Sequence, residues 1–402
     1  MARLIGNIIG YNNWPDIPFY VLPIPKHLAG IVNGLTYLLT EISSTTYLSQ
    51  LHTDLTTKTI YMRTRMFFSL FVLIISLASC SKMGSNPPAG SGDTTAKAGG
   101  GGSGTGGGTG TNTCNNSLAD AETIAIFPSD NEWHKDISSA PVDLYSTQIL
   151  AHYATTGLHP DFGSGQIGGL PFGIPASVVC ASQPKVAIVF RQNSVDGNFG
   201  NESDPGPYPI PLNAPVESGG DAHVIVVDKD AHKLYELYNA SVNGDHWEAS
   251  SGAVFDLNSN AYRPDGWTSA DAAGLPIFPG LIRYDELVKG TIDHAIRFTL
   301  GRANTLSSYI LPARHAGNGS GTVHNALPFG ARLRLKASVN ISTYPAHLQT
   351  ILKAFKKYGI ILADIGSNMY ISGTQDGRWD NDELSNLRNI KASDFEVINI
   401  GN

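Results

Sequence analysis

The chain from Cys114 to its end is patterned as short apolar runs rather than as long amphipathic helices. β-Branched and aromatic residues dominate these runs, and Gly, Pro, Asn and Asp lie at their ends. Runs of this length and composition are typical of β-strands. The predicted strands are residues 185–190, 223–228, 233–238, 294–299, 332–336 and 369–372.

For two of these regions the sequence also predicts a turn or a degree of burial. Residues 223–238 predict a hairpin that turns at 229–232, and Asp228 and Asp230 are assigned to its turn. The run that starts at Arg332 alternates strictly between arginine and leucine. Since successive side chains of a strand point to opposite faces, we expect this strand to be half buried.

Three segments have helical spacing. The first is residues 145–155, and the third, 381–390, follows the acidic residue Asp380. The clearest is residues 345–358, which has a proline near its start and Gly359 just past its end. Its apolar positions share one helical face and are Leu348, Ile351, Leu352 and Phe355.

The order of these elements indicates the fold class. No alternation of strands and helices typical of βαβ units is visible, and no repeat of 20–50 residues occurs. Doubly wound folds and propellers are therefore disfavoured. We predict a mainly β protein in which residues 114–402 form one large β-sandwich or jelly-roll-like domain with a few short helices.

Residues 62–80 have the layout of a secretory signal. Arg63 and Arg65 precede a twelve-residue apolar run that ends in small residues, which is too short to span a bilayer comfortably. The final Leu-Ala-Ser-Cys80 resembles the lipobox of bacterial lipoproteins. This resemblance implies cleavage before Cys80 and attachment of a lipid to its thiol.

The segments on either side of this signal fit that interpretation. Residues 1–61 precede a signal that should be N-terminal, so we expect translation to begin at Met62 and the upstream residues to be a gene-start error. Residues 81–113 include a tract in which nine of residues 99–110 are glycine. Such a tract predicts a flexible tether with a reach of roughly 30 Å. The protein is thus expected in the bacterial cell envelope, anchored to a membrane through lipid and facing the periplasm or the surface.

The chain has three cysteines. If Cys80 carries the lipid, Cys114 and Cys180 remain, and export permits a disulfide between them. That bridge would stabilise the fold by about 4 kcal/mol in the chain-entropy model. The alternative is two separate buried thiols.

Composition and motifs narrow the function classes. The chain is 42% hydrophobic, too apolar for a disordered protein, and 27 basic against 34 acidic residues give a net charge of −7. No basic run is present, so nucleic acid is not an expected partner. Motifs of zinc proteases, structural zinc modules, α/β-hydrolases and EF-hands are missing from the sequence. We expect no metal, no cofactor and a monomer.

Several runs of the domain are similar to segments of secreted bacterial proteins. This resemblance does not imply any particular activity, so no catalytic residue is assigned from it. The runs are residues 127–133, 157–163, 204–211 and 263–271.

The long loop at residues 256–285 is the first candidate site. It mixes an aromatic residue, a cation and carboxylates on a β scaffold, where binding loops are common. Trp267 could stack on a sugar ring, with Arg263 and Asp265 beside it, and Asp265 or Asp271 could act as an acid or base. The alternative is an ordinary turn followed by one helical turn.

Glu236 is the second candidate. It shares a strand face with Leu234 and Tyr238, and a carboxyl among apolar side chains has a raised pKa, as a general acid requires. The alternatives are an exposed edge strand or an ion pair with arginine. Histidines form the third group, in which His223 and His294 begin strands and His315 follows Arg314; its other members are His159 and His246. Each alone is more typical of a hydrogen-bonded structural residue.

These features favour an exported carbohydrate-active enzyme that acts on a polysaccharide or oligosaccharide. The preferred prediction is a glycoside hydrolase with Asp271 and Glu236 as its catalytic carboxyl pair and His294 nearby. Its predicted substrate-binding residues are Trp267, Arg263, Asp265, His315 and Tyr238. The alternatives are a polysaccharide lyase that uses His, Tyr and Arg, and a glycan-binding lipoprotein without activity.

Overall fold

The computed structural model describes residues 117–167, 170–192 and 197–400. The predictions for residues 1–61, the signal sequence with Cys80, the tether and Cys114 lie outside them. Within the described residues strands predominate, in several mixed sheets with few short helices, as predicted for a β-sandwich. None of the described helices is long and apolar enough to cross a membrane.

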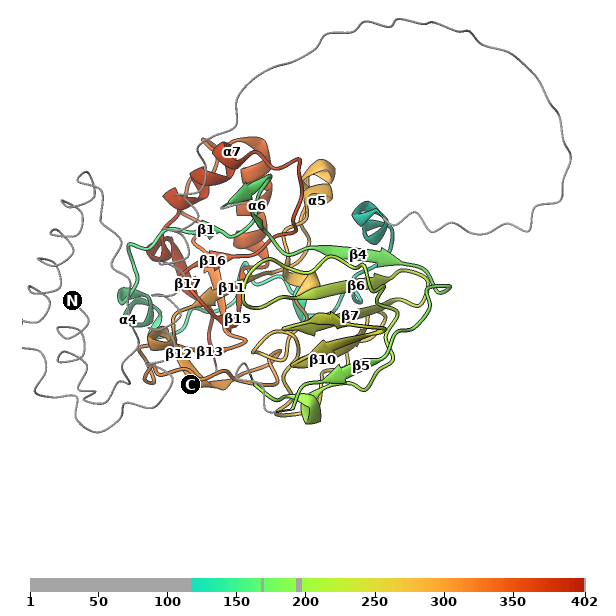
Figure 1. Cartoon of the computed structure of the whole chain (residues 1–402). Helices are drawn as coiled ribbons and strands as arrows, with labels where there is room; N and C mark the ends of the chain where they lie inside the picture. Colours follow the sequence, from blue (N-terminus) through green and yellow to red (C-terminus); the bar gives the residue numbers. More distant parts are fainter. Residues whose placement is uncertain (1–116, 168–169, 193–196, 401–402) are drawn as a thin grey trace, which may run out of the picture. The chain divides into compact units, whose positions relative to one another are not determined.

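A four-stranded sheet forms one half of the domain. Figure 1 shows its strands side by side in the order β10-β7-β6-β4. Strands β6 and β7 form the predicted antiparallel hairpin, and Asp228 accepts the backbone N–H groups of Asp230 and Ala231 in the turn. The strands are β4 (Ala176–Val179), β6 (Val224–Asp228), β7 (Lys233–Tyr238) and β10 (Ser251–Asp256).

A six-stranded mixed sheet forms the other half, in the order β1-β16-β11-β15-β14-β17. Its central pair, β11 and β15, is parallel, and helix α6 lies on the connection between them and packs on β14. The strands are β1 (His159–Pro160), β11 (Ile296–Leu300), β14 (Arg332–Leu335), β15 (Ile360–Ile365), β16 (Tyr370–Ile371) and β17 (Phe395–Val397).

The four-stranded sheet is buried on both faces. Since its side chains alternate, Ile225 and Leu234 join the larger core that includes the six-stranded sheet, while Val226 and Leu237 join a smaller core around Trp247. A third sheet, in the order β5-β9-β8, supplies that smaller core. Its strands are β5 (Ile188–Phe190), β8 (Ser241–Asn243) and β9 (His246–Ala249).

Short elements connect these sheets. Two small sheets pair β2 (Gln166–Ile167) with β3 (Leu170–Pro171), and β12 (Thr305–Tyr309) with β13 (Leu327–Phe329). The α-helices are α4 (Ser146–Ala151), α5 (Tyr284–Lys289), α6 (Ala346–Lys357) and α7 (Asn381–Ser385). The 3-10 turns are η2 (Leu118–Thr123), η3 (Glu132–His134), η4 (Gly200–Glu202), η5 (Phe278–Gly280), η6 (Arg302–Asn304), η7 (Asn386–Asn389) and η8 (Ala392–Asp394).

One local prediction is wrong. All four residues of β14 are buried, including both arginines, so the strand is not half exposed. The Arg332 guanidinium donates to the carbonyls of Tyr358 and Glu132, and Arg334 pairs with Glu396 across the sheet. Alternation of charged and apolar residues therefore did not mark a solvent face, because each buried charge has polar partners.

Candidate functional site

Asp271 is fully buried, and its carboxylate is held by Arg297 of β11. The guanidinium donates through Nε to Oδ2 at 2.9 Å and through Nη2 to Oδ1 at 2.8 Å. Asp364 is hydrogen-bonded to the same carboxyl group, and its own pKa is raised far above the usual range by burial and by the Asp271 charge. Asp271 thus lies in a closed ion pair and not on a surface that a substrate reaches.

Glu236 lies on the inner face of β7 and has no exposed surface. Its carboxyl oxygens accept the backbone N–H groups of Ile277 and Phe278 at 2.9 Å, just where turn η5 begins. Burial raises the pKa of Glu236 to about 7, although these hydrogen bonds oppose the shift. The nearby charge of Asp271 adds to the rise, so the structure does bring the two predicted carboxyl groups close together.

His294 belongs to a different group of charges. Its Nε2 atom lies 2.8 Å from Oε1 of Glu286, and Arg283 joins Glu286 to Glu122. This network lines a cavity of about 420 Å³ beside helix α5. The hydrogen bonds of the His294 ring go to Glu286 and Ala295, not to Asp271 or Glu236.

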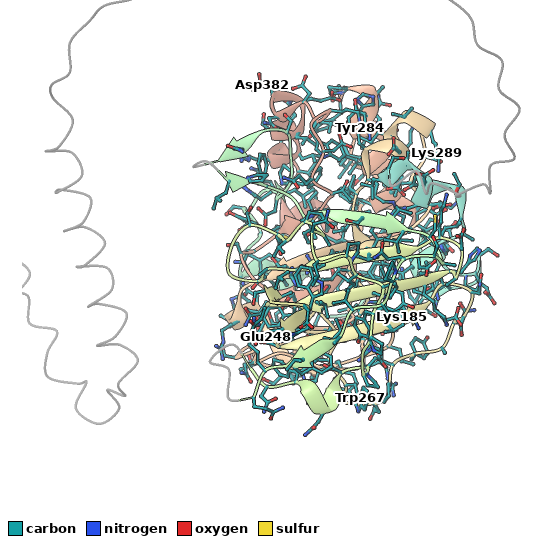
Figure 2. All side chains as sticks on the ribbon, turned by 45° about the vertical axis from the view of Figure 1, so that its right-hand side comes forward. Lys185, Glu248, Trp267, Tyr284, Lys289 and Asp382 are labelled. Carbon is teal, nitrogen blue, oxygen red and sulfur yellow. The ribbon has the colours of Figure 1, made fainter. Side chains whose placement is uncertain are left out.

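The predicted binding loop is assembled as one cluster. Arg263 lies over the Trp267 ring, Arg314 pairs with Asp265, and His315 lies 3.8 Å from Glu202. In Figure 2, Trp267 lies at one end of the domain and Asp382 of helix α7 at the other. Tyr238 is not part of this loop cluster, and the centre of its ring lies 5.8 Å from that of the His223 ring.

An open cleft of about 500 Å³ lies on the α7 side of the domain. Strand β1, the β2–β3 hairpin, residues 217–219 and helix α7 form its walls. None of the residues predicted as catalytic or substrate-binding lines it. The ionisable side chains that line it are His159, Asp161, Glu217 and Arg388.

Glu217 is held in the cleft wall by the buried residue His223. The imidazole donates from Nδ1 to Oε2 of Glu217 at 2.5 Å and from Nε2 to the carbonyl of Ala270 at 3.0 Å. When Glu217 is ionised, both ring nitrogens face acceptors, an arrangement that the imidazolium satisfies. Burial alone lowers the pKa of His223, but the Glu217 charge and hydrogen bond outweigh it and raise the pKa to about 9.

The same pair keeps Glu217 ionised. Burial by itself raises the pKa of Glu217, but the charge and hydrogen bonds of His223 hold that pKa below its ordinary value. The Glu217 side chain keeps 19% of its surface exposed, so part of this carboxylate still faces the cleft.

Asp161 is the second carboxyl group of the cleft. It follows β1, and its backbone N–H donates to the carbonyl of Ile371 in the neighbouring strand, which fixes its place. Burial raises the pKa of Asp161, and the negative charge of Glu217 contributes to the rise. The two carboxyl groups of one cleft therefore have pKa values displaced in opposite directions.

His159 lies beside these carboxyl groups on β1. Its ring stacks on that of Tyr370, with centroids 4.0 Å apart. Burial and the positive charge of Arg388 lower the pKa of His159, which favours the neutral imidazole, the form that can accept a proton.

Sequence reasoning missed the cleft for identifiable reasons. Asp161 lies in the run 157–163, which was noted only for its resemblance to other secreted proteins. Glu217 lies in a Gly- and Pro-rich stretch, and only its proximity to His223 shows that it forms part of a site. The sequence did contain an indication of this site: His159, a base, and Asp161, an acid, are separated by one proline in a run flanked by glycines.

No group of three or more His, Cys, Asp or Glu side chains in the described part of the chain could hold a metal ion. Cys180 is disulfide-bonded, and the other two cysteines of the chain lie outside the described residues. In comparisons with known proteins, no family model, curated protein or solved structure matches the chain.

Proposed function

We propose that the protein hydrolyses glycosidic bonds in the cleft lined by Asp161 and Glu217. The observation that carries this proposal is the pair of carboxyl groups in one open cleft. The pKa of Asp161 is raised, which favours its acid form, and the pKa of Glu217 is lowered, which favours its anion. Glycoside hydrolases generally use such a pair, and opposite displacement of pKa values separates the two roles. The proposal keeps the predicted activity class but moves the acid–base pair from Asp271 and Glu236.

The two carboxyl groups would act in sequence on one bond. Asp161, whose raised pKa favours the protonated form, would donate its proton to the glycosidic oxygen as the bond breaks. Glu217 would act on the other side of the sugar, either as a nucleophile or as the base that activates water. His223 is a positioning residue, since it touches Glu217 and not the substrate.

The direct test is hydrolysis by Asp161→Asn and Glu217→Gln. Each change should lower kcat by about 10²–10⁴-fold, the usual contribution of an acid–base group. The assay is release of reducing ends from a panel of glucans, mannan, xylan, pectin and hyaluronan. Asp245→Asn is the matched control, because Asp245 is fully exposed in the β8–β9 turn and should leave the rate unchanged.

Wild-type protein that binds one of these polymers saturably but releases no product would contradict the hydrolase. Loss of release in Asp271→Asn or Glu236→Gln, without loss of folding and with Asp161→Asn still active, would restore the original assignment.

One arrangement in the same cleft favours a second candidate, a polysaccharide lyase. A lyase needs a base that removes a proton beside a uronate carboxylate, and a cation that neutralises that carboxylate. His159, whose lowered pKa favours the neutral base, is stacked on Tyr370, and Arg388 is a cation of the same cleft. A product with the ultraviolet absorbance of an unsaturated uronate, lost in His159→Ala, would establish this reaction in place of hydrolysis.

We also propose that the enzyme acts at the bacterial envelope, held there by a lipid on Cys80. The support is the order of basic start, apolar run and terminal cysteine. Metabolic labelling with an alkyne fatty acid should mark the wild-type protein in membrane fractions, and Cys80→Ser should abolish both label and membrane retention. Cys180→Ser is the control, and equal labelling of all three proteins would contradict the anchor.

A further inference from the structure

Two aromatic side chains, Tyr262 and Trp267, lie five residues apart on the loop that follows β10. Tyr262 has 48% of its surface exposed, and Trp267 is half-buried. Figure 2 places Trp267 at the end of the domain opposite Asp382, which lies on the helix that borders the cleft. These rings therefore form a surface separate from the cleft, here called the Tyr262–Trp267 platform.

Each ring of the platform is backed by a guanidinium group. Arg314 lies over Tyr262 at 5.9 Å from the ring centre, and Arg263 lies over Trp267 at 5.7 Å. A cation over one face of a ring stabilises the ring in place, so a ligand would have to stack on the opposite face.

The guanidinium groups are themselves fixed. Arg263 is buried, pairs with Asp204 at 2.5 Å and donates to the carbonyl of Thr268. Arg314 pairs with Asp265 at 2.9 Å and donates to the carbonyl of Arg263. Because the rings rest on fixed supports, little conformational entropy is lost when a ligand stacks on them.

Two carboxylates also lie on or beside this loop. The Asp265 side chain is 72% exposed and accepts the Tyr309 hydroxyl, and Glu202, with 33% of its side chain exposed, accepts the backbone N–H of Thr268, the residue after Trp267. Carboxylates suit a ligand with hydroxyl donors and repel a ligand with phosphates. Flat apolar faces rimmed by hydroxyl acceptors match a pyranose ring and not a nucleic acid.

We propose that the Tyr262–Trp267 platform is a second carbohydrate-binding site, which holds a polysaccharide chain by stacking of sugar rings on both aromatics. It is independent of the chemistry assigned to the cleft and binds without cleaving.

The test is a depletion assay with insoluble cellulose, chitin and mannan. It is carried out in the Glu217→Gln background so that polymer is not consumed. Protein with both rings intact should be depleted saturably by at least one polymer. Tyr262→Ala and Trp267→Ala should each weaken that binding roughly three- to tenfold, and the double variant should lose it.

The matched control is Leu144→Ala, which removes an apolar side chain that is 95% exposed elsewhere on the domain and should bind as the parent does. Trp267→Phe keeps a ring and should retain most of the affinity, which separates stacking from a folding defect. Binding by the double variant equal to the parent overturns the proposal, as does failure of the parent to bind any of the three polymers. The assay needs no turnover, so an absence of hydrolysis would refute the cleft's function without deciding this one.

Discussion

At the residue scale, His223 decides the charge state of the cleft. It is buried, yet both of its ring nitrogens face oxygen acceptors. Against an ionised Glu217 a neutral imidazole, with one N–H, would leave one of these contacts repulsive, and the raised pKa of His223 favours the doubly protonated ring. That proton holds Glu217 as an anion at neutral pH, which is the state the proposed chemistry requires.

The first prediction concerns the pH dependence of stability. The pKa of His223 is about 9 in the folded protein and about 6.5 when unfolded, so its stabilisation is complete below pH 6.5 and disappears as the pH rises through 9. The change is on the order of 3 kcal/mol. His223→Gln should lose this part of the decline, as measured by urea unfolding between pH 6 and 10. Parallel curves for the two proteins would show that His223 does not hold the extra proton.

At the scale of elements, local sequence patterns located three of the four α-helices in the described residues and strands such as β6, β7 and β11, but they missed others, including the central strand β15. Helix α6 buries its four predicted apolar residues, and it ends where Gly359 adopts a φ of 74°, a backbone conformation that glycine tolerates best. The β6–β7 hairpin formed as predicted. Predictions were poorer where tertiary partners changed a residue's environment, as for the arginines of β14.

The second prediction concerns helix α7, which borders the cleft. Asp380 caps it by accepting the N–H groups of Asp382 and Glu383 at 3.0 Å. Asp380→Ala should lower the free energy of unfolding by about 1 kcal/mol. Asp380→Asn keeps an acceptor and should cost less. If urea unfolding gives equal losses for the two variants, the cap contributes through its charge rather than through its hydrogen bonds.

At the scale of the whole molecule, two sheets meet around a core that carries charge as well as apolar side chains. Arg297 joins Asp271 and Ser372 within this core, and its charge influences Glu217 and Asp161 at the cleft. The packing of the sheets thus determines the electrostatics of a cleft at their edge.

The third prediction concerns the disulfide of Cys180. If its partner is Cys114, a Cys114→Ser/Cys180→Ser double variant should be less stable by about 4 kcal/mol, and reduction should destabilise only the wild-type protein. Peptide mapping without reduction should recover the linked peptides. A linkage to Cys80 instead would remove both this bridge and the proposed lipid attachment.

The sequence by itself determined the β-rich class, the hairpin and the helices, because these depend on periodicity and turn residues within a few positions of one another. It also drew attention to Asp271 and Glu236, which do lie near each other. Only the tertiary structure decided which carboxyl groups are exposed. Asp271 and Glu236 are closed off by Arg297 and by backbone N–H groups, whereas Asp161 and Glu217, far apart in the chain, both line one open cleft. The reason is physical, since burial and ionisation of a side chain depend on neighbours that the fold supplies from distant segments.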